Sequence, residues 1–261
     1  MSPIKSSIAL TVVGFDPSGG AGVLADVRTF AAFGLQAYAA ITSITFQNPS
    51  RVFGAVRQTG EVVRAQVLPL LEDFSIVCAK TGMLPTPEVV MEVARLFRET
   101  ELPRPVVDPV ILSSSGQRLM EEDALATLVE ELLPLARLVT PNIPEAETLT
   151  GITITSEADM RSAAATIREL GARAVLIKGG HLVGEDAGGA PAVPVEAIDV
   201  LDDEGKVTVF REQRISGAEL HGSGCVLSAA IAAGLGKGLT LEDSVGAAKS
   251  FVLAALQNWE R

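Results

Sequence analysis

Short apolar runs alternate along the chain with longer stretches that have helical periodicity. The first run, 8–13, is continuously apolar and ends at Gly14, which is typical of a strand buried on both faces of a parallel sheet. The stretch 60–71 places Val63 and Val67 on one face, as expected of an amphipathic helix. The same patterns predict strands at 37–46, 52–56, 76–79, 105–110, 138–140 and 174–177, and helices at 23–33, 87–97, 121–133 and 157–170. Repeated alternation of strand and helix predicts a parallel sheet covered by helices on both faces.

The last third of the chain departs from this alternation. Residues 195–201 and 206–214 flank the acidic turn 202–205, which predicts an antiparallel hairpin. Two helices are predicted to follow, at 225–235 and 241–259. The stretch 184–194 is rich in Gly, Ala and Pro, and it predicts a mobile flap rather than a domain linker. We therefore expect one α/β domain over 1–261, a three-layer αβα fold whose doubly wound, mostly parallel sheet carries an antiparallel hairpin in its C-terminal half.

Composition and charge narrow the class of protein. The chain is 48% hydrophobic but only 4% aromatic, which predicts an interior of Ala, Val and Leu. A formal net charge of −11 argues against a nucleic-acid or anionic-membrane partner, because both would repel the surface. The run 8–13 is too short to span a membrane. Only two cysteines are present, Cys78 and Cys225, so there is no disulfide framework. We expect a soluble, cytoplasmic protein with a small-molecule substrate.

Polar residues gather at the predicted carboxyl ends of the strands, where ligands bind in open α/β sheets. These residues are Asp16, Gln47, Thr81, Asp108, Asn142, Glu145 and Lys178. Any single acid at such a place is more often a helix cap or a turn former. Their accumulation along one edge of the sheet indicates a binding site.

The turn 221–225, His-Gly-Ser-Gly-Cys, leads directly into the Ala-rich helix. Gly222 and Gly224 allow a sharp turn, and the unpaired N–H groups at the start of the helix form an anion site. Cys225 lies at that start, where the pKa of a thiol tends to fall. The turn therefore predicts phosphate binding, oxyanion stabilisation and proton removal at one place, although a tight turn with a small buried cysteine is the plainer interpretation.

The other strand-end residues suggest phosphoryl transfer. Asp108, Asn142 and Glu145 offer the hard oxygen ligands that suit Mg²⁺, and Lys178 offers a point charge for a phosphate. Asp16 would repel phosphate, so we expect a neutral acceptor at the N-terminal glycine turn. The chain has no Walker motif, and the dinucleotide-binding fingerprint fails because no strand follows the helix after the turn.

Seven sequence blocks in register resemble the hydroxymethylpyrimidine and phosphomethylpyrimidine kinases of thiamine synthesis, within the ribokinase-like superfamily. The blocks are 14–22 (GFDPSGGAG), 47–48 (QN), 80–83 (KTGM), 107–110 (VDPV), 140–147 (TPNIPEAE), 178–181 (KGGH) and 221–225 (HGSGC). Together they extend over nearly the whole chain. The family's usual Lys-Ile-Gly-Met and His-Gly-Thr-Gly-Cys differ here at Thr81 and Ser223. Phe46 and Pro49 flank the QN block, where smaller residues are more usual.

The resemblance implies roles for individual residues. The pyrimidine ring would lie at Gly14, Asp16, Ala21, Asp26, Gln47, Met83 and Val110. ATP would be bound by Asp108, Thr140, Asn142, Lys178, His221 and Lys249, with Mg²⁺ at Asp108, Asn142 and Glu145. Transfer would depend on Lys178 and the turn Gly222, Ser223, Gly224 and Cys225, where Cys225 takes the place of the aspartate base of the related sugar kinases. The resemblance also implies a homodimer.

Two other functions remain open from the residues. A pyridoxal or pyridoxine kinase would act on another flat heterocycle that bears a hydroxymethyl group. A non-catalytic ligand-binding protein could also use the same fold, although Asp108, Glu145, Lys178 and Cys225 together argue against it.

Overall fold

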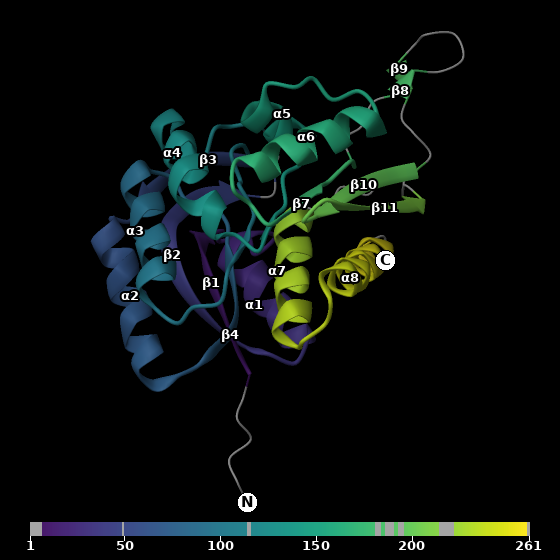
Figure 1. Ribbon diagram of the computed structural model, residues 1–261. Coiled ribbons are helices and arrows are strands. Elements are labelled where there is room, and N and C mark those ends of the chain that lie inside the picture. Colours follow the sequence, from purple (N-terminus) through teal and green to yellow (C-terminus); the bar gives the residue numbers. More distant parts are fainter. Residues whose placement is uncertain are drawn as a thin grey trace, which may run out of the picture.

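A nine-stranded sheet organises the protein (Figure 1). The computed structural model describes residues 7–48, 50–113, 116–180, 184–185, 191–192, 196–213 and 222–259. The strands of this sheet are β1 (Ile8–Phe15), β2 (Gln36–Asn48), β3 (Arg51–Arg57), β4 (Ile76–Thr81), β5 (Val106–Val107), β6 (Leu138–Val139), β7 (Ala174–Ile177), β10 (Glu196–Asp203) and β11 (Lys206–Gln213). Their order is β11-β10-β7-β6-β5-β4-β1-β2-β3. In this spatial order, all neighbouring strands between β7 and β2 pair in parallel. At one end of the sheet β3 pairs antiparallel with β2, and at the other end β10 pairs antiparallel with both β7 and β11. The mostly parallel sheet is therefore confirmed.

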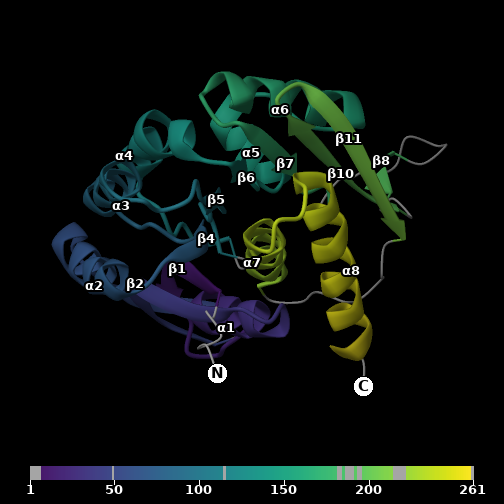
Figure 2. The same ribbon diagram turned by 60° about the horizontal axis from the view of Figure 1, so that its bottom comes forward.

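Helices cover both faces of the sheet, as Figure 2 shows. One layer consists of α1 (Gly22–Ala32), α7 (Ser223–Gly236) and α8 (Leu241–Trp259). The other consists of α2 (Gly60–Asp73), α3 (Pro87–Glu99), α4 (Glu122–Thr127), α5 (Ile143–Thr150) and α6 (Glu157–Glu169). Successive strand residues alternate between the two layers: Ala9 and Cys78 pack with α7, whereas Leu10 and Ala79 pack with α2 and α3. This alternation follows from the period of two in a strand and produces one core on each side of the sheet.

Local sequence explains most element boundaries. Thr59 and Thr86 begin α2 and α3 by accepting a backbone hydrogen bond at the helix start. In the β10–β11 hairpin the turn is narrower than predicted: it contains Glu204 and Gly205, both at positive φ. That geometry is the one that keeps two twisted strands paired across a two-residue turn.

Two parts of the chain that were predicted to contain helix or no regular structure differ from the prediction. The helix expected over 121–133 is α4 followed by a π-helical turn, Leu128–Leu132, and a 3₁₀ turn, Leu133–Leu135. Pro134 cannot donate a backbone hydrogen bond, so a regular α-helix does not continue through it. The second difference is α5, which the apolar pattern did not reveal because it spans only eight residues.

The expected flap lies mostly outside the described residues. Within 184–194, the structure describes only β8 (Gly184–Glu185) and β9 (Pro191–Ala192), which pair antiparallel. His221, predicted to contact ATP, also lies outside the described residues. In the described part of the chain, no helix has the length and apolar character that crossing a membrane requires.

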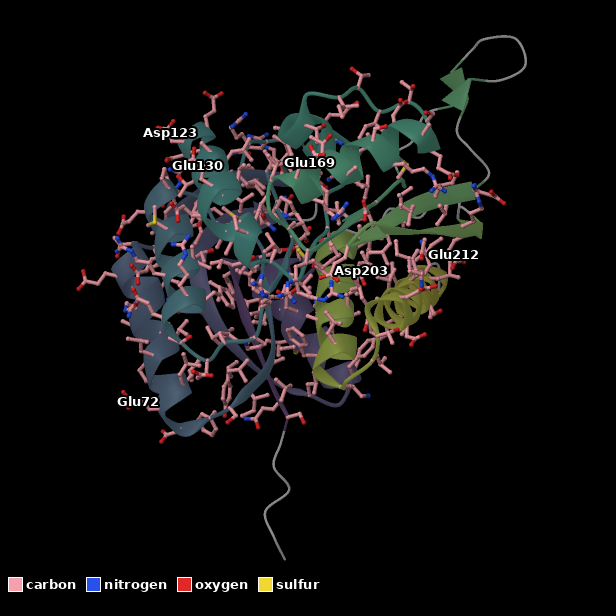
Figure 3. All side chains as sticks on the ribbon, viewed as in Figure 1. Glu72, Asp123, Glu130, Glu169, Asp203 and Glu212 are labelled. Carbon is pink, nitrogen blue, oxygen red and sulfur yellow. The ribbon has the colours of Figure 1, made fainter. Side chains whose placement is uncertain are left out.

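Acidic side chains are spread over the outer elements (Figure 3). The labelled carboxylates are Glu72, Asp123, Glu130, Glu169, Asp203 and Glu212, which come from different helices and strands. The net charge of −11 is therefore not confined to one patch. At the carboxyl edge of the sheet, by contrast, lysines are paired with buried aspartates: Lys80 with Asp26, and Lys178 with Asp108.

Candidate active site at the carboxyl edge of the sheet

The starts of α1 and α7 meet at the carboxyl edge of the sheet. Gly22 has φ +59, and a Cβ on it would lie 2.3 Å from the carbonyl oxygen of Gly14. Gly222 has φ +81, and a Cβ there would lie 2.0 Å from the carbonyl oxygen of Gly20. The two turns therefore pack backbone against backbone, which only glycine permits. The backbone N–H of Gly22 donates to the thiol of Cys225, so this thiol lies between two helix starts.

Asp16 organises the turn that precedes α1. Its Oδ1 accepts from the backbone N and the hydroxyl of Ser18 at 2.8 and 2.7 Å, and its Oδ2 accepts from the backbone N of Ala21 at 2.9 Å. Burial acts to raise the pKa of Asp16, but the hydrogen bonds from Ser18, Gln47 and Ala21 outweigh it and hold the pKa below its ordinary value. The carboxylate thus connects the α1 turn to Gln47 at the end of β2.

Lys178 and Asp108 form an ion pair at the ends of β7 and β5. The distance from Lys178 Nζ to Asp108 Oδ1 is 3.0 Å, and the two side chains are 15% and 4% exposed. Thr140 and Ser228 each donate a hydroxyl hydrogen bond of 3.3 Å to Asp108, one to each oxygen. A Cβ on Gly224 would lie 3.2 Å from Lys178 Nζ, so the ammonium group lies against the first turn of α7. An anion at that turn would meet both the helix start and a lysine.

Asn142 and Glu145 form a capping box at the start of α5. The side chain of Asn142 accepts from the backbone N of Glu145, and the carboxylate of Glu145 accepts from the backbone N of Asn142, each at 2.9 Å. Glu145 also accepts from the backbone N of Ile111 at 3.2 Å. The spacing Asn-x-x-Glu is itself the sequence signal of a helix start, and it explains α5. The amide oxygen of Asn142, predicted as a metal ligand, is engaged in this cap.

The carboxylates of Asp108 and Glu145 influence each other. Burial raises the pKa of Glu145, and although Lys178 opposes the effect, the charge of Asp108 adds to it. Burial also acts to raise the pKa of Asp108, but Lys178 and Lys80 outweigh it and lower the pKa. Two buried carboxylates with one nearby lysine between them leave an excess of negative charge. Their oxygen chemistry fits Mg²⁺, which commonly takes one or two carboxylates together with water and phosphate oxygens.

A second lysine lies beneath the site. Lys80, on β4, is fully buried, and its Nζ lies 2.9 and 2.8 Å from the two carboxylate oxygens of Asp26. Asp26, predicted as a substrate contact, is also fully buried, and Thr11 donates to it at 2.6 Å. The prediction did not single out Lys80 except within a family motif. The sequence signal that could have revealed it is its position directly after the apolar run 76–79, where a strand is still expected to be buried.

The predicted acceptor pocket is lined by backbone in unusual conformations. A Cβ on Gly14 would lie 3.1 Å from the sulfur of Met83, so these two predicted residues are in contact. Val110 has φ +43, which is rare for a β-branched residue and is typical of functional sites. It follows Asp108 by two residues and precedes Ile111, whose backbone N binds Glu145. Val110 and Asp108 therefore belong to one segment, and Glu145 on α5 is attached to it through Ile111.

Lys249 lies apart from the cluster around Cys225. Its Nζ is 2.6 Å from Asp199 Oδ2, and Asp199 Oδ1 accepts from the backbone N of Gly179 at 2.8 Å. The pair joins α8 to the residue that follows Lys178. Lys249 is thus connected to the site through Gly179, and its predicted contact with ATP stays a prediction.

Comparisons with known proteins agree on the family. The model of the phosphomethylpyrimidine kinase family matches residues 16–260. The chain belongs to this family.

Similar proteins support the assignment. The hydroxymethylpyrimidine/phosphomethylpyrimidine kinase of Rhizobium meliloti is 42% identical over 98% of this chain and 92% of its own length. A thiamine biosynthesis bifunctional protein of Geobacter sulfurreducens is 38% identical over 98% of this chain and 50% of its own length. Members of the phosphomethylpyrimidine kinase family are phosphotransferases, and the chain is accordingly an enzyme of this class.

Two solved structures show the same fold. The phosphomethylpyrimidine kinase of Clostridium difficile has a TM-score of 0.82 and 35% identity, with 96% of this chain and 100% of that chain covered. The pyridoxal kinase of Staphylococcus aureus, in complex with AMP-PCP and pyridoxal, has a TM-score of 0.85 and 29% identity, with 97% and 88% covered. The ribokinase-like fold expected for the phosphomethylpyrimidine kinase family is confirmed.

Proposed function

We propose that this enzyme transfers the γ-phosphoryl group of ATP to the hydroxymethyl group of 4-amino-5-hydroxymethyl-2-methylpyrimidine, and then to the resulting monophosphate, in thiamine biosynthesis. The observation that carries the proposal is the meeting of the α1 and α7 starts at the thiol of Cys225, with the Lys178–Asp108 pair beside α7. This arrangement combines an anion turn, a phosphate-binding lysine and a proton acceptor in a member of the kinase family.

In the proposed step two bonds form and two break. The acceptor hydroxyl gives its proton to the thiolate form of Cys225, which becomes the thiol, while the hydroxyl oxygen forms a bond to the γ-phosphorus. The bond from that phosphorus to the bridging oxygen breaks, and ADP leaves. The amides of Ser223 and Gly224 face the charge that develops on the transferred group, and Lys178 adds a positive charge.

Cys225 is protonated at neutral pH before ligands bind. Burial raises its pKa to about 11, and although Lys80 opposes this effect, Asp108 and Asp26 add to it. This result differs from the expectation that the helix start makes a ready thiolate, because loss of water outweighs the helix dipole. Only the thiolate can accept a proton, so nearby positive charge is needed to lower the pKa of the thiol and favour that form.

The ring of the acceptor is assigned to the pocket of Gly14, Ala21, Gln47, Met83 and Val110. Gln47 both donates and accepts, so it suits the amine and nitrogen edge of a pyrimidine. Met83 supplies a polarisable apolar wall. Asp26 lies behind this pocket, where its carboxylate is already paired with Lys80.

For the metal, we assign Asp108 and Glu145 as the residues that would hold Mg²⁺, with ATP on the same side as Lys178. Bound there, the ion would neutralise charge on the phosphates. Glu145→Gln should raise the Mg²⁺ concentration needed for half-maximal turnover while acceptor binding is unchanged. A wild-type Mg²⁺ dependence would leave Glu145 as a helix cap only.

The decisive experiment is a series of substitutions at Cys225. We expect Cys225→Ala to fold and bind both substrates but to lose about 10²–10⁴ in turnover, the usual contribution of a positioned acid or base. Cys225→Asp should recover part of the loss, because a carboxylate can accept the proton, whereas Cys225→Ser should not. If all three variants turned over like wild type, the thiol would contribute packing alone.

Pyridoxal or pyridoxine is the alternative acceptor, favoured by the likeness to a pyridoxal kinase in complex with pyridoxal. A coupled ADP-release assay with the pyrimidine alcohol and pyridoxine side by side separates the two. A higher kcat/KM for pyridoxine would overturn the proposed acceptor.

We also infer a single-domain, cytoplasmic homodimer. Both cysteines are free, which suits a reducing compartment. Four apolar side chains of β2 and β3 are exposed: Ile44 41%, Phe46 52%, Phe53 60% and Val56 52%. Exposed apolar side chains on the edge strand β3 and its neighbour β2 are a suitable contact for a second copy. Light scattering of the wild type and of Phe46→Asp tests this, and a monomeric wild type would contradict it.

A further inference from the structure

The Lys80–Asp26 pair lies inside the core, beneath the helix starts that flank the thiol of Cys225. Lys80 and Thr11 are partners in the β4–β1 register, on the face of the sheet that packs against α1 and α7. Asp26 lies one helical turn after Gly22 on α1, and the N–H of Gly22 donates to Cys225. The ammonium group of Lys80 is therefore enclosed between two strands and the two helices whose starts flank the thiol.

Stability alone does not explain this pair. Moving two charges out of water costs several kcal/mol per ion, and apolar replacements of similar volume are often neutral or stabilising. Both side chains are fully buried, so neither offers a surface to a partner or a freely diffusing ligand. A structural role would be served as well by the apolar residues that fill the rest of the strand.

The charges around Cys225 divide into two kinds. Lys80 on β4 and Lys178 after β7 are positive, whereas Asp108 after β5 and Asp26 on α1 are negative. Lys80 lowers the pKa of the thiol and so favours the thiolate, whereas Asp108 and Asp26 raise it. Lys178 is partly exposed, and phosphate groups bound to it would offset its charge. Lys80 has no exposed surface, so its charge remains throughout the reaction.

We propose that Lys80, whose ion pair with Asp26 is supported by a hydrogen bond from Thr11 to Asp26, is a positioning residue that stabilises the thiolate of Cys225, the form that accepts the proton of the acceptor hydroxyl. The proposal rests on the proposed role of Cys225 as the base. Lys80 does not touch the substrate, and its action is through the field of a fixed, buried charge.

The experiment compares two variants that lose the same charge but differ in stability. Lys80→Met leaves Asp26 buried without its partner, and it will be less stable. Lys80→Met/Asp26→Asn removes both charges with side chains of similar size, so it should regain stability. If the pair were only structural, the double variant would also regain wild-type reactivity.

The readout is the pH dependence of Cys225 alkylation by iodoacetamide in the ligand-free enzyme, followed by peptide mass spectrometry. The wild-type rate should rise about tenfold per pH unit below the thiol pKa of about 11. In Lys80→Met we expect an upward shift of that pKa by about one unit, so that the rate at pH 8 falls about tenfold. In the double variant we expect a smaller shift in the same direction, because the charge of Asp26, which raises the pKa of the thiol, is lost as well. Turnover at saturating substrates should fall by a similar factor, while KM for the acceptor changes little.

A matched control uses the other buried lysine pair. Lys249→Met/Asp199→Asn removes an ion pair of comparable burial that lies on α8 and β10. In the ligand-free enzyme, this change should leave the alkylation profile of Cys225 as in wild type. A shift equal to that of the Lys80 variants would mean that any loss of buried charge has the effect, and it would overturn the proposal.

Two further outcomes would overturn the inference for different reasons. A folded Lys80→Met/Asp26→Asn with wild-type alkylation and turnover would show that the charge of Lys80 does not act on the thiol. Wild-type turnover by Cys225→Ala would instead remove the proposed base, and with it the role of Lys80, while the alkylation data still report the field at the thiol.

Discussion

Two lysine–aspartate pairs lie close to one thiol, and they differ in their access to solvent. The Lys80–Asp26 pair is fully buried within β4 and α1, whereas the Lys178–Asp108 pair lies at the strand ends with Lys178 15% exposed. Their ion-pair distances are similar, 2.8 and 3.0 Å. The position of the lysine along its strand therefore decides what its charge can do. The ammonium group of Lys80, inside the sheet, cannot reach a ligand, whereas that of Lys178, beyond the end of its strand, can.

The first prediction breaks the buried pair. Lys80→Met should lower the free energy of unfolding by about 3–5 kcal/mol, because it leaves Asp26 uncompensated in the core. Lys178→Met should cost less, since water can reach the strand ends. Urea unfolding of the two variants measures the difference. Equal losses would contradict the distinction between a fixed and an accessible pair.

The second prediction concerns the accessible pair. Lys178→Met should reduce turnover by about 10²–10³, the typical loss when one group that stabilises transition-state charge is removed. The fold should be retained, as judged by near-ultraviolet circular dichroism. ADP release measures the loss, and Lys178→Arg, which keeps the charge, is the matched variant. Near wild-type turnover of Lys178→Met would limit Lys178 to a structural partner of Asp108.

Much of this arrangement could be predicted from the sequence. Parallel strands place their carboxyl ends at one edge, so Asp108 after β5 and Lys178 after β7 were expected at the same edge. The structure adds that they form an ion pair of 3.0 Å. The glycines at 22 and 222 were expected to form turns, but their mutual packing depends on how α1 and α7 lie on the sheet. The pattern of residues within each turn does not show which other turn it will contact.

Other features were missed for identifiable reasons. The Asn142–Glu145 capping box has a clear spacing, but its oxygens were interpreted as metal ligands because they follow a strand. Lys80 gave no signal of its role, since its partners Thr11 and Asp26 are distant in the chain. The raised pKa of Cys225 depends on tertiary burial, which outweighs the local effect of the helix start.

The third prediction separates recognition of the acceptor from both charge pairs. Gln47→Leu should weaken binding of the pyrimidine alcohol by about 1–3 kcal/mol, because polar groups of the ring would be buried without partners. ATP binding and the alkylation profile of Cys225 should be unchanged. Calorimetric titration with each ligand tests this. Unchanged affinity for the alcohol would place the ring elsewhere.

The smallest effect is expected from the hydroxyl that supports the accessible pair. Ser228 donates to Asp108 at 3.3 Å, but its hydroxyl also lies 3.0 and 3.1 Å from the carbonyl oxygens of Gly224 and Cys225. Because the contact with Asp108 is long and shared, Ser228→Ala should cost only about 0.5–1.5 kcal/mol in kcat/KM. The effect should appear in kcat rather than in the stability of the protein, since Thr140 and Lys178 still hold Asp108. Steady-state kinetics with urea unfolding of the same variant tests the assignment. A stability loss as large as that of Lys80→Met would show that Asp108, like Asp26, belongs to the core rather than to the ligand site.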